Sequence, residues 1–293
     1  MTQVLSADRG APPVPPTVKG ARARRVARYF GLAIAAFIVL FPIYSAIAVA
    51  IQPASALINA DGLSVLFPKD ISFSAFGDAF DQGHLGRYLR NSVIQASLTT
   101  VAQVTTSVLA AYAFAFLRFP GKRLVFFAFL ATLMIPTEVI VVAQFQIVSD
   151  LGWLNSFQGL VIPFVAWAFG TFMIRQAFLN VPGDLRDATA LDGYGHAGFM
   201  WHVAIPLARP AIAALSVFSF LYAWNEYLWP LLVTDKPAVR TVQVGLKSLS
   251  SANVDELNLV MAGTLIAALP IALVLIVFQR HLVRGLTAGA VKG

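Results

Sequence analysis

The chain has 293 residues, of which 58% are hydrophobic and only 12% are charged, and its mean hydropathy is +0.74. An ordinary soluble domain carries about 25% charged residues, so this composition predicts a protein embedded in a lipid bilayer. The net charge of +7 does not indicate nucleic-acid binding, because the basic residues form short clusters beside apolar runs. The lack of cysteine excludes disulfides, and the four scattered histidines lack zinc-ligand spacing, so we expect no bound metal.

The first apolar run follows a polar tail. Residues 1–20 contain GAPPVPP without apolar periodicity, and an arginine cluster then ends at Arg28, so residues 1–28 are predicted to form a disordered tail. Residues 29–51 are long enough for a membrane-spanning helix, which needs about 20 residues. A cleaved signal peptide is the alternative, since ASA follows at 54–56, but the run is longer than a signal core.

Further apolar runs follow the first. They cover residues 91–117, 124–147, 157–179, 208–233 and 258–279. The sequence therefore predicts an all-α membrane protein with six transmembrane helices in a domain at 29–279. Prolines inside or at the ends of these spans predict kinks within a packed bundle; they are Pro42, Pro136, Pro163, Pro230 and Pro270.

The basic residues between the spans predict the orientation. With the N-terminus in the cytoplasm, 15 of the Lys and Arg residues lie in inside segments and 6 lie outside. Cytoplasmic loops carry an excess of Lys and Arg, so both termini, including the tail at 280–293, are expected in the cytoplasm. The polar segment at 184–210, between the fourth and fifth spans, is then cytoplasmic as well.

The segment at 184–210 has strong local signals. Asp184 is placed to cap a short helix, with Asp187 three residues on as a variant capping box. Gly193 is placed to end this helix in a left-handed turn. A second short amphipathic stretch runs from Phe199 to Ile205, before Pro206 and Pro210. Two short helices around a glycine would form a compact surface that fits a groove on a partner.

The same segment resembles a loop of a known family. The membrane subunits of ATP-binding-cassette (ABC) importers carry the pattern E-A-A-x3-G-x9-I-x-L-P, and here Asp187-Ala188-Thr189, Gly193 and Val203-Ala204-Ile205-Pro206 have the same spacing. The resemblance implies a type I ABC importer permease fold, in which this loop docks on an ATPase subunit. It assigns the coupling role to Asp187, Ala188, Thr189, Asp192, Gly193 and Pro206. The alternative is a polar loop that matches by chance.

Two further features concern partners. The chain has no G-x-x-x-x-G-K-[ST] phosphate loop, so we expect ATP and Mg to bind a partner ATPase, with no cofactor on this chain. The C-terminal residues resemble the tail of permeases in the maltose-type, carbohydrate-importing branch, which implies that Gly289 and Lys292 contact the ATPase; a frayed tail is the alternative. The resemblance also implies a second permease subunit, an ATP-binding dimer, an extracytoplasmic binding protein and an inner-membrane location.

Carboxylates at membrane depth indicate a solute path, because an ionisable group there is costly. Residues 133–139 hold Glu138 beside Pro136, and residues 222–232 hold Glu226 among aromatic rings. Both stretches resemble those of permeases that import sn-glycerol 3-phosphate more than those of plain sugar permeases. The candidate path residues are Glu138, Gln144, Trp224, Asn225, Glu226 and Tyr227.

The tryptophans near Glu226 allow two interpretations. Glu226 with Trp224, Tyr227 and Trp229 could form a cage for a quaternary ammonium group, as in a choline head group. The alternative is an interfacial aromatic belt, in which these rings contact lipid and no solute.

The sequence thus predicts a permease that translocates sn-glycerol 3-phosphate or glycerophosphodiesters such as glycerophosphocholine by alternating access, without catalysing covalent chemistry. A sugar or oligosaccharide permease of the same family is the nearest alternative. An ion-coupled secondary carrier, whose folds often show paired halves, is an alternative of another class. A membrane-embedded enzyme is disfavoured, because neither Glu138 nor Glu226 has a histidine or nucleophile beside it in the sequence.

Overall fold

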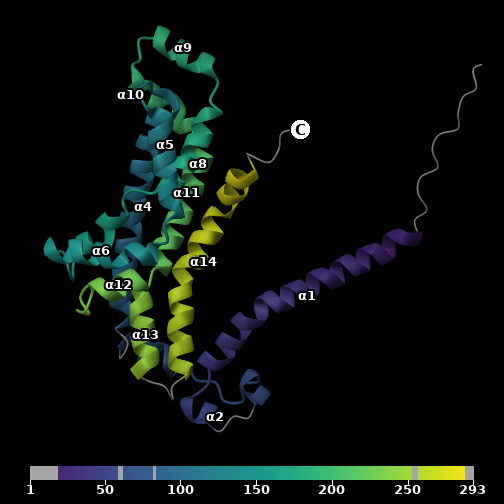
Figure 1. Ribbon diagram of the computed structural model, residues 1–293. Helices are drawn as coiled ribbons and strands as arrows, with labels where there is room; N and C mark the ends of the chain where they lie inside the picture. The colour runs from purple at the N-terminus through teal and green to yellow at the C-terminus, as the bar shows by residue number, and fades with distance from the viewer. Residues whose placement is uncertain (1–18, 59–61, 82–83, 253–256, 288–293) are drawn as a thin grey trace, which may run out of the picture. The chain divides into compact units, whose positions relative to one another are not determined.

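A computed structural model describes residues 19–58, 62–81, 84–252 and 257–287, and all regular structure within these ranges is helical (Figure 1). Residues 1–18 of the predicted tail, and the predicted contact residues Gly289 and Lys292, lie outside the described residues. The chain divides into two compact units, Met1–Ile47 and Ala48–Gly293. This boundary falls inside the first predicted span and thus within the domain expected at 29–279.

Four helical stretches are long and apolar enough to cross a membrane: Arg24–Ala50, Leu85–Phe116, His196–Asn225 and Leu257–Gln279. Two bent pairs pass the same criterion together. Lys122–Met134 and Thr137–Asp150 meet at 100°, and Phe157–Phe164 and Ala168–Leu179 meet at 49°. The described residues therefore contain four to six candidate spans, and six if each bent pair is one span.

The breaks in the two bent pairs follow from proline chemistry. Pro136 has φ −61° and ψ 136° and immediately precedes α6 (Thr137–Asp150), while Pro163 lies in the short helix η3 (Ile162–Phe164) before α8 (Ala168–Leu179). Proline lacks a backbone N–H and disfavours helical geometry at the residue before it. The sequence expected kinks at these prolines, and the structure has complete breaks in direction.

The unit Met1–Ile47 contains most of helix α1 (Lys19–Ala50), whose apolar side chains are largely exposed. The helix begins at Lys19, so residues 19–28, which the sequence placed in the disordered tail, are helical. Alanine and arginine have high helix propensity, which allows the helix to extend beyond the apolar run toward the N-terminus.

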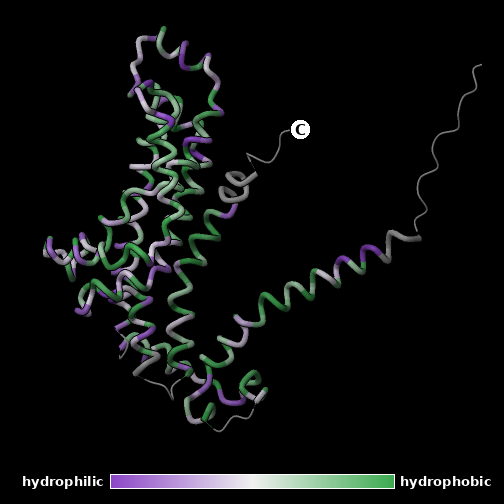
Figure 2. The backbone as a smooth tube through the Cα atoms, viewed as in Figure 1, coloured by the Kyte–Doolittle hydropathy of each residue, from purple (hydrophilic) through white to green (hydrophobic). Residues whose placement is uncertain are grey.

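The unit Ala48–Gly293 is built around α4 (Leu85–Phe116), which packs against α8 and α11 (Ile205–Asn225). Helix α14 (Leu257–Thr287), which Figure 2 shows to be largely hydrophobic, packs against α11. The remaining elements are α2 (Ala54–Ile58), η1 (Gly62–Leu66), α3 (Ser74–Asp81), α5 (Lys122–Ala131), η2 (Thr132–Met134), α7 (Phe157–Val161), α9 (Gly183–Leu191), α10 (His196–Phe199), the π-helix η4 (Met200–Ala204), α12 (Leu228–Val233) and α13 (Val242–Ala252).

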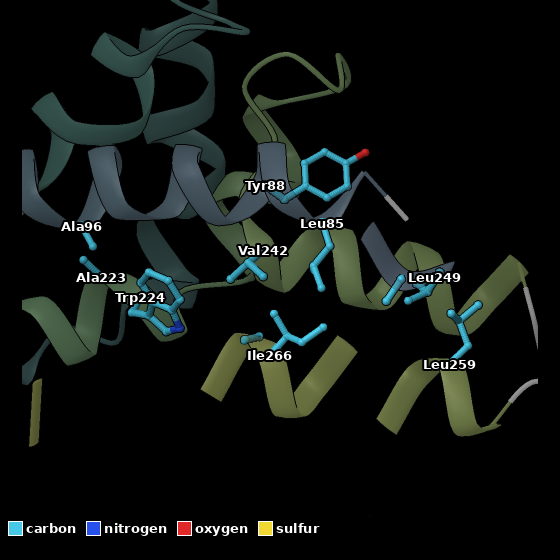
Figure 3. Close-up of a cluster of buried hydrophobic side chains, with 11 residues drawn as sticks. Leu85, Tyr88, Ala96, Ala223, Trp224, Val242, Leu249, Leu259 and Ile266 are labelled. Atoms are coloured by element: carbon cyan, nitrogen blue, oxygen red, sulfur yellow. The ribbon is translucent and has the colours of Figure 1, made fainter. Parts of the chain in front are cut away.

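Two buried clusters hold this unit together. One joins Leu85 and Ala96 of α4 to Trp224, Val242 and Ile266 (Figure 3). The other lies nearer the C-terminal end of α4, and its largest members are Tyr112, Ile174, Phe178, Phe199 and Leu215. Helix α4 contributes to both clusters, so it connects the two ends of the unit.

A close approach of helices at Gly170 yields a stability prediction. A Cβ atom there would overlap Ser107 Oγ and would lie 3.2 Å from a Leu215 methyl carbon. We expect Gly170→Ala to lower the stability of the folded chain by about 1–3 kcal/mol, the usual cost of overpacking, measured by thermal inactivation in detergent. Gly77→Ala is the matched control, since nothing lies within 4 Å of its added Cβ. Equal stability of the two variants would contradict the prediction.

Candidate functional site

The segment at 184–210 forms the expected short helix before a glycine turn, but the second stretch is not a separate short helix. There α10, η4 and α11 run on as one continuous helix, His196–Asn225. Helix α9 ends at Leu191, and Gly193 has a left-handed φ of +83°. The Tyr194 N–H donates to Thr189 O and the Gly193 N–H to Ala190 O, both at 3.1 Å. These two bonds satisfy orphan carbonyls at the helix end, so Gly193 has the turn geometry that the sequence predicted.

The start of α9 differs from the sequence expectation. Helix α9 begins at Gly183 with Pro182 as its N-cap residue and no side-chain cap. Asp184 therefore lies inside the first turn and does not cap the helix, so the capping box with Asp187 is not formed. A carboxylate in the first turn still stabilises the helix through its dipole.

Most predicted coupling residues are accessible. Asp187, Ala188, Asp192 and Gly193 are exposed, whereas Pro206 is half-buried and begins α11. Thr189 is buried, and its hydroxyl donates to Leu185 O. Figure 1 shows α9 and α10 at one end of the unit, with α13 at the other.

Large apolar side chains add to this surface and were missed from the sequence. Leu191 is 90% exposed, Trp201 is 63% exposed and Tyr194 is 49% exposed. We define the coupling surface as Asp187, Ala188, Leu191, Asp192, Gly193, Tyr194 and Trp201. Isolated exposed leucines are common, but an aromatic pair beside an exposed leucine on one loop is typical of a binding surface. The family pattern is defined by small residues, so it did not indicate these three large side chains.

The loop is bonded to the C-terminal end of α4 from two elements. The Tyr112 hydroxyl donates to His196 O at 2.9 Å and lies 3.1 Å from His196 Nδ1. Arg186 Nη1 of α9 donates to Phe116 O at 3.3 Å. Hydrogen bonds from both α9 and α10 therefore join the loop to the C-terminal end of α4.

Two more cations reach the same end of α4. Lys122 Nζ donates to Leu117 O at 2.9 Å, and Arg175 Nε of α8 donates to Phe114 O at 3.3 Å. The last carbonyls of a helix lack intrahelical partners and carry partial negative charge. Cations from three elements thus fix the end of α4 to its surroundings.

A cavity of about 280 Å³ lies where both bent spans break. Its polar and aromatic lining residues are Gln103, Thr132, Thr137, Gln144, Phe164, Trp167 and Tyr222. None of the described residues that line it is charged. The predicted path residue Gln144 therefore lines the cavity, and its buried Oε1 has no hydrogen-bond partner among the described residues.

A much smaller chamber adjoins the cavity. It has a volume of about 10 Å³ and is lined by Gln95, Thr99, Phe164, Tyr222, Ala223 and Glu226. Phe164 and Tyr222 line both spaces. This volume is about enough for one water molecule.

Tyr222 brings the two predicted carboxylates into one region. Glu226 and Glu138 both act electrostatically on its side chain, which also lies near Thr137. Glu138 lies in the exposed first turn of α6, outside the residues that line either space. Glu226 lines the chamber and follows the last residue of α11.

The fifth predicted span, 208–233, is interrupted at Glu226. Helix α11 stops at Asn225, and Glu226 is extended with ψ 123°. Pro230 has no N–H, so it cannot donate a helical hydrogen bond to the Glu226 carbonyl. The Trp229 N–H, in the first turn of α12, donates instead to Glu226 Oε1 at 3.2 Å. The predicted single span is therefore two helices.

The aromatic cage suggested around Glu226 is not formed. Trp224 is 1% exposed and packs with Phe220, and it belongs to the cluster drawn in Figure 3. Trp229 is 2% exposed in a different cluster and donates Nε1–H to Gly159 O at 2.9 Å. Neither indole lines the cavity or the chamber.

The last two predicted path residues lie at the end of α11. Asn225 is exposed and donates Nδ2–H to Leu221 O at 2.7 Å, and Tyr227 is half-buried at the start of α12. Neither is among the residues that line the cavity or the chamber.

A buried polar stripe on α4 was missed from the sequence. Its members are at most 3% exposed and recur every three or four residues after the first pair: Asn91, Ser92, Gln95, Thr99, Gln103 and Ser107. Such spacing places them on one helix face. The spacing of these uncharged polar residues is present in the sequence, but the predicted solute path was argued from carboxylates.

The described residues contain no group of three or more His, Cys, Asp or Glu side chains that could hold a metal ion. The arrangement thus offers an accessible coupling surface, a helix that connects it to the interior, and a neutral polar cavity. These are features of a helical membrane transport subunit.

Comparison with known proteins agrees with this class. Residues 103–288 match the family model of the binding-protein-dependent transport system inner membrane component. The sn-glycerol-3-phosphate transport system permease protein UgpE of Yersinia pestis bv. Antiqua (strain Antiqua) is 34% identical over 263 residues, covering 87% of this chain and 93% of the relative. UgpE of Yersinia enterocolitica (serotype O:8 / biotype 1B, strain NCTC 13174 / 8081) is 39% identical over 203 residues, covering 69% and 72%.

A solved structure supports the fold. A chain from a crystal structure of a bacterial ABC transporter involved in the import of the acidic polysaccharide alginate has a TM-score of 0.79, with 24% identity, over 91% of this chain and 99% of that chain. The chain belongs to the family of binding-protein-dependent transport system inner membrane components. It is a multi-pass inner-membrane permease subunit of an ABC importer and not an enzyme, and ATP is handled by a partner subunit. The ion-coupled carrier and membrane-enzyme alternatives are therefore excluded.

Proposed function

We propose that this permease imports sn-glycerol 3-phosphate or glycerophosphodiesters such as glycerophosphocholine. The observation that carries the proposal is the identity of 34–39% with relatives named as sn-glycerol-3-phosphate permeases. A permease for a sugar or oligosaccharide is the second candidate, supported by the fold shared with an alginate importer chain. The proposed partners are a second permease subunit, a dimer of ATP-binding subunits, an extracytoplasmic binding protein and membrane lipid.

The proposed mechanism is alternating access driven from the coupling surface. Both termini and the coupling surface lie in the cytoplasm, where Asp187, Ala188, Thr189, Asp192, Gly193 and Pro206 belong to the loop that docks on the ATPase. Closure of the ATPase moves α9 and α10, and the bonds of Arg186 and Tyr112 pass this movement to α4. Because α4 also lines the cavity through Gln103, the movement changes access to it. Gly289 and Lys292 remain predicted ATPase contacts.

The cavity is the proposed part of the solute path contributed by this subunit. Its lining is neutral, with Gln144 exposing an unpartnered acceptor, while Glu138 and Glu226 lie near Tyr222 at its edge. A carboxylate repels a phosphate dianion but attracts a cation. A phosphodiester that carries a cationic head group therefore fits this region better than a bare phosphate does.

Uptake competition tests the solute. In cells whose only importer contains this chain, excess glycerol 3-phosphate or glycerophosphocholine should reduce uptake of labelled glycerol 3-phosphate at least tenfold, and maltose should not. Uptake of labelled maltose, reduced by excess maltose but by neither glycerol phosphate, would instead favour the sugar permease.

Neutralising Glu226 tests the electrostatic preference. We expect Glu226→Gln to reduce uptake of glycerophosphocholine about threefold to tenfold relative to uptake of glycerol 3-phosphate, because one attractive charge is lost. The amide still accepts a hydrogen bond from the Trp229 N–H, so the start of α12 is preserved. Asp150→Asn, at the exposed end of α6, is the control. An unchanged ratio of the two uptake rates would remove Glu226 from the solute path.

A further inference from the structure

The chamber beside the cavity contains buried acceptors without partners. Gln95 is 3% exposed and Thr99 is 2% exposed, and neither Gln95 Oε1 nor Thr99 Oγ1 has a hydrogen-bond partner among the described residues. Both residues line the chamber, together with Glu226. Leaving a buried polar atom unpaired is unfavourable, so such a pair facing one space points to an occupant.

Three other residues of the buried polar stripe on α4 do have hydrogen-bond partners. Asn91 Nδ2 donates to Ala238 O and Arg240 O, and Ser92 Oγ accepts from the Val242 N–H. Gln103 donates to Phe164 O and accepts from Ser219 Oγ. These side chains on either side of the chamber join α4 to its neighbours, whereas Gln95 and Thr99, between them, do not.

The chemistry of the three groups defines the occupant. A glutamine Oε1 and a carboxylate only accept hydrogen bonds, and a threonine hydroxyl accepts as well as donates. The occupant must therefore donate hydrogen bonds. The chamber, at about 10 Å³, admits nothing larger than one water or one hydroxyl group.

We propose that Gln95, Thr99 and Glu226 form a subsite for one hydroxyl group of a polyol or sugar moiety of the solute, which replaces a water molecule there. The inference deepens the proposed function and rests on the solute reaching the adjoining cavity. Tyr222 and Phe164, which line both spaces, are the positions past which the hydroxyl enters.

The subsite also orients the solute. The Glu226 carboxylate repels phosphate, so the hydroxyl end of a glycerol phosphate points into the chamber. The phosphate then lies in the larger, neutral cavity. Glu226 therefore serves the hydroxyl end, in addition to attracting any cationic head group.

The test compares each solute with its deoxy analogue in the assembled importer. Wild-type transporter in proteoliposomes should import glycerol 3-phosphate at least tenfold faster than analogues that lack one hydroxyl. Thr99→Val, which keeps the side-chain shape, and Gln95→Met, which keeps most of its length, should each reduce this ratio about fivefold or more. The ratio is taken within each variant, so differences in the amount of inserted protein cancel.

Ser107→Ala is the matched control. Ser107 is also buried and unpartnered on the same face of α4, but it lines neither space. In Ser107→Ala, the ratio of glycerol 3-phosphate import to deoxy-analogue import should equal that of the wild type. The proposal is overturned if Thr99→Val and Gln95→Met both keep the wild-type ratio, or if Ser107→Ala lowers it equally. It is also overturned if wild type does not distinguish the deoxy analogues, because the chamber would then hold only water.

The same measurement separates this inference from the proposed function. Failure of wild type to import glycerol 3-phosphate and glycerophosphocholine would reject the proposed solutes alone, if maltose is imported. The hydroxyl subsite is then judged with maltose and its deoxy analogues on the same variants. Import of none of these hydroxyl-bearing solutes would reject both.

Discussion

Replacing Gly193 with valine is expected to abolish solute-stimulated ATP hydrolysis by the assembled importer, while the chain still inserts in the membrane. Gly193 has φ +83°, a conformation that a β-branched residue adopts only with strain of about 1–3 kcal/mol. Nothing lies within 4 Å of an added Cβ, so the effect comes from the backbone. The turn between α9 and α10 would change shape, and the coupling surface would lose its fit to the ATPase.

Gly195→Val is the matched control for this result. Gly195 lies two residues further along the same turn, with φ −78° and ψ −172°, and an added Cβ meets nothing within 4 Å. Valine adopts this extended conformation readily. We expect Gly195→Val to retain most of the stimulated hydrolysis. Equal hydrolysis by the two variants would show that the left-handed turn is not needed for coupling.

Cutting both bonds between the loop and α4 is expected to uncouple ATP hydrolysis from transport. The double variant Tyr112→Phe, Arg186→Gln removes the donors to His196 O and Phe116 O. Phenylalanine keeps the contacts of the Tyr112 ring with Phe116, Phe178 and Phe199. We expect solute imported per ATP hydrolysed to fall about tenfold, measured with labelled solute and released phosphate in proteoliposomes.

The single change Arg175→Gln provides the comparison. Arg175 also donates to the end of α4, at Phe114 O, but it comes from α8 and not from the coupling loop. Its loss should lower stability without changing the ratio of solute to ATP. If the double variant couples as well as Arg175→Gln does, the movement of the loop reaches the cavity by another route.

The strongest sequence predictions rested on spacing and composition. Long apolar runs predicted helices because a bilayer offers no partner for unpaired backbone groups, and the structure has four to six candidate spans. Gly193 was identified because a left-handed helix end favours glycine, and its φ confirms the turn. The family pattern around Asp187 identified the class of protein, which the family match then confirmed.

The misses have a common physical cause. Asp184 lies inside its helix because backbone geometry, and not its side chain, set the first residue of α9. Trp224 and Trp229, five residues apart, were grouped as one cage, yet the break at Glu226 sends them into separate cores. Nearness along the chain does not predict nearness in space once a helix is broken.

The sequence by itself determined the lipid-embedded helical class, the left-handed turn at Gly193, and the need for a partner that hydrolyses ATP. These follow from hydropathy, local backbone preference and a missing phosphate loop, all of which act within short stretches of chain. Only the tertiary structure decided that α4 joins the loop to the cavity, and that Gln95 and Thr99 meet Glu226 at the chamber. Contacts between residues 70 or more positions apart depend on how the helices pack, which no local pattern specifies.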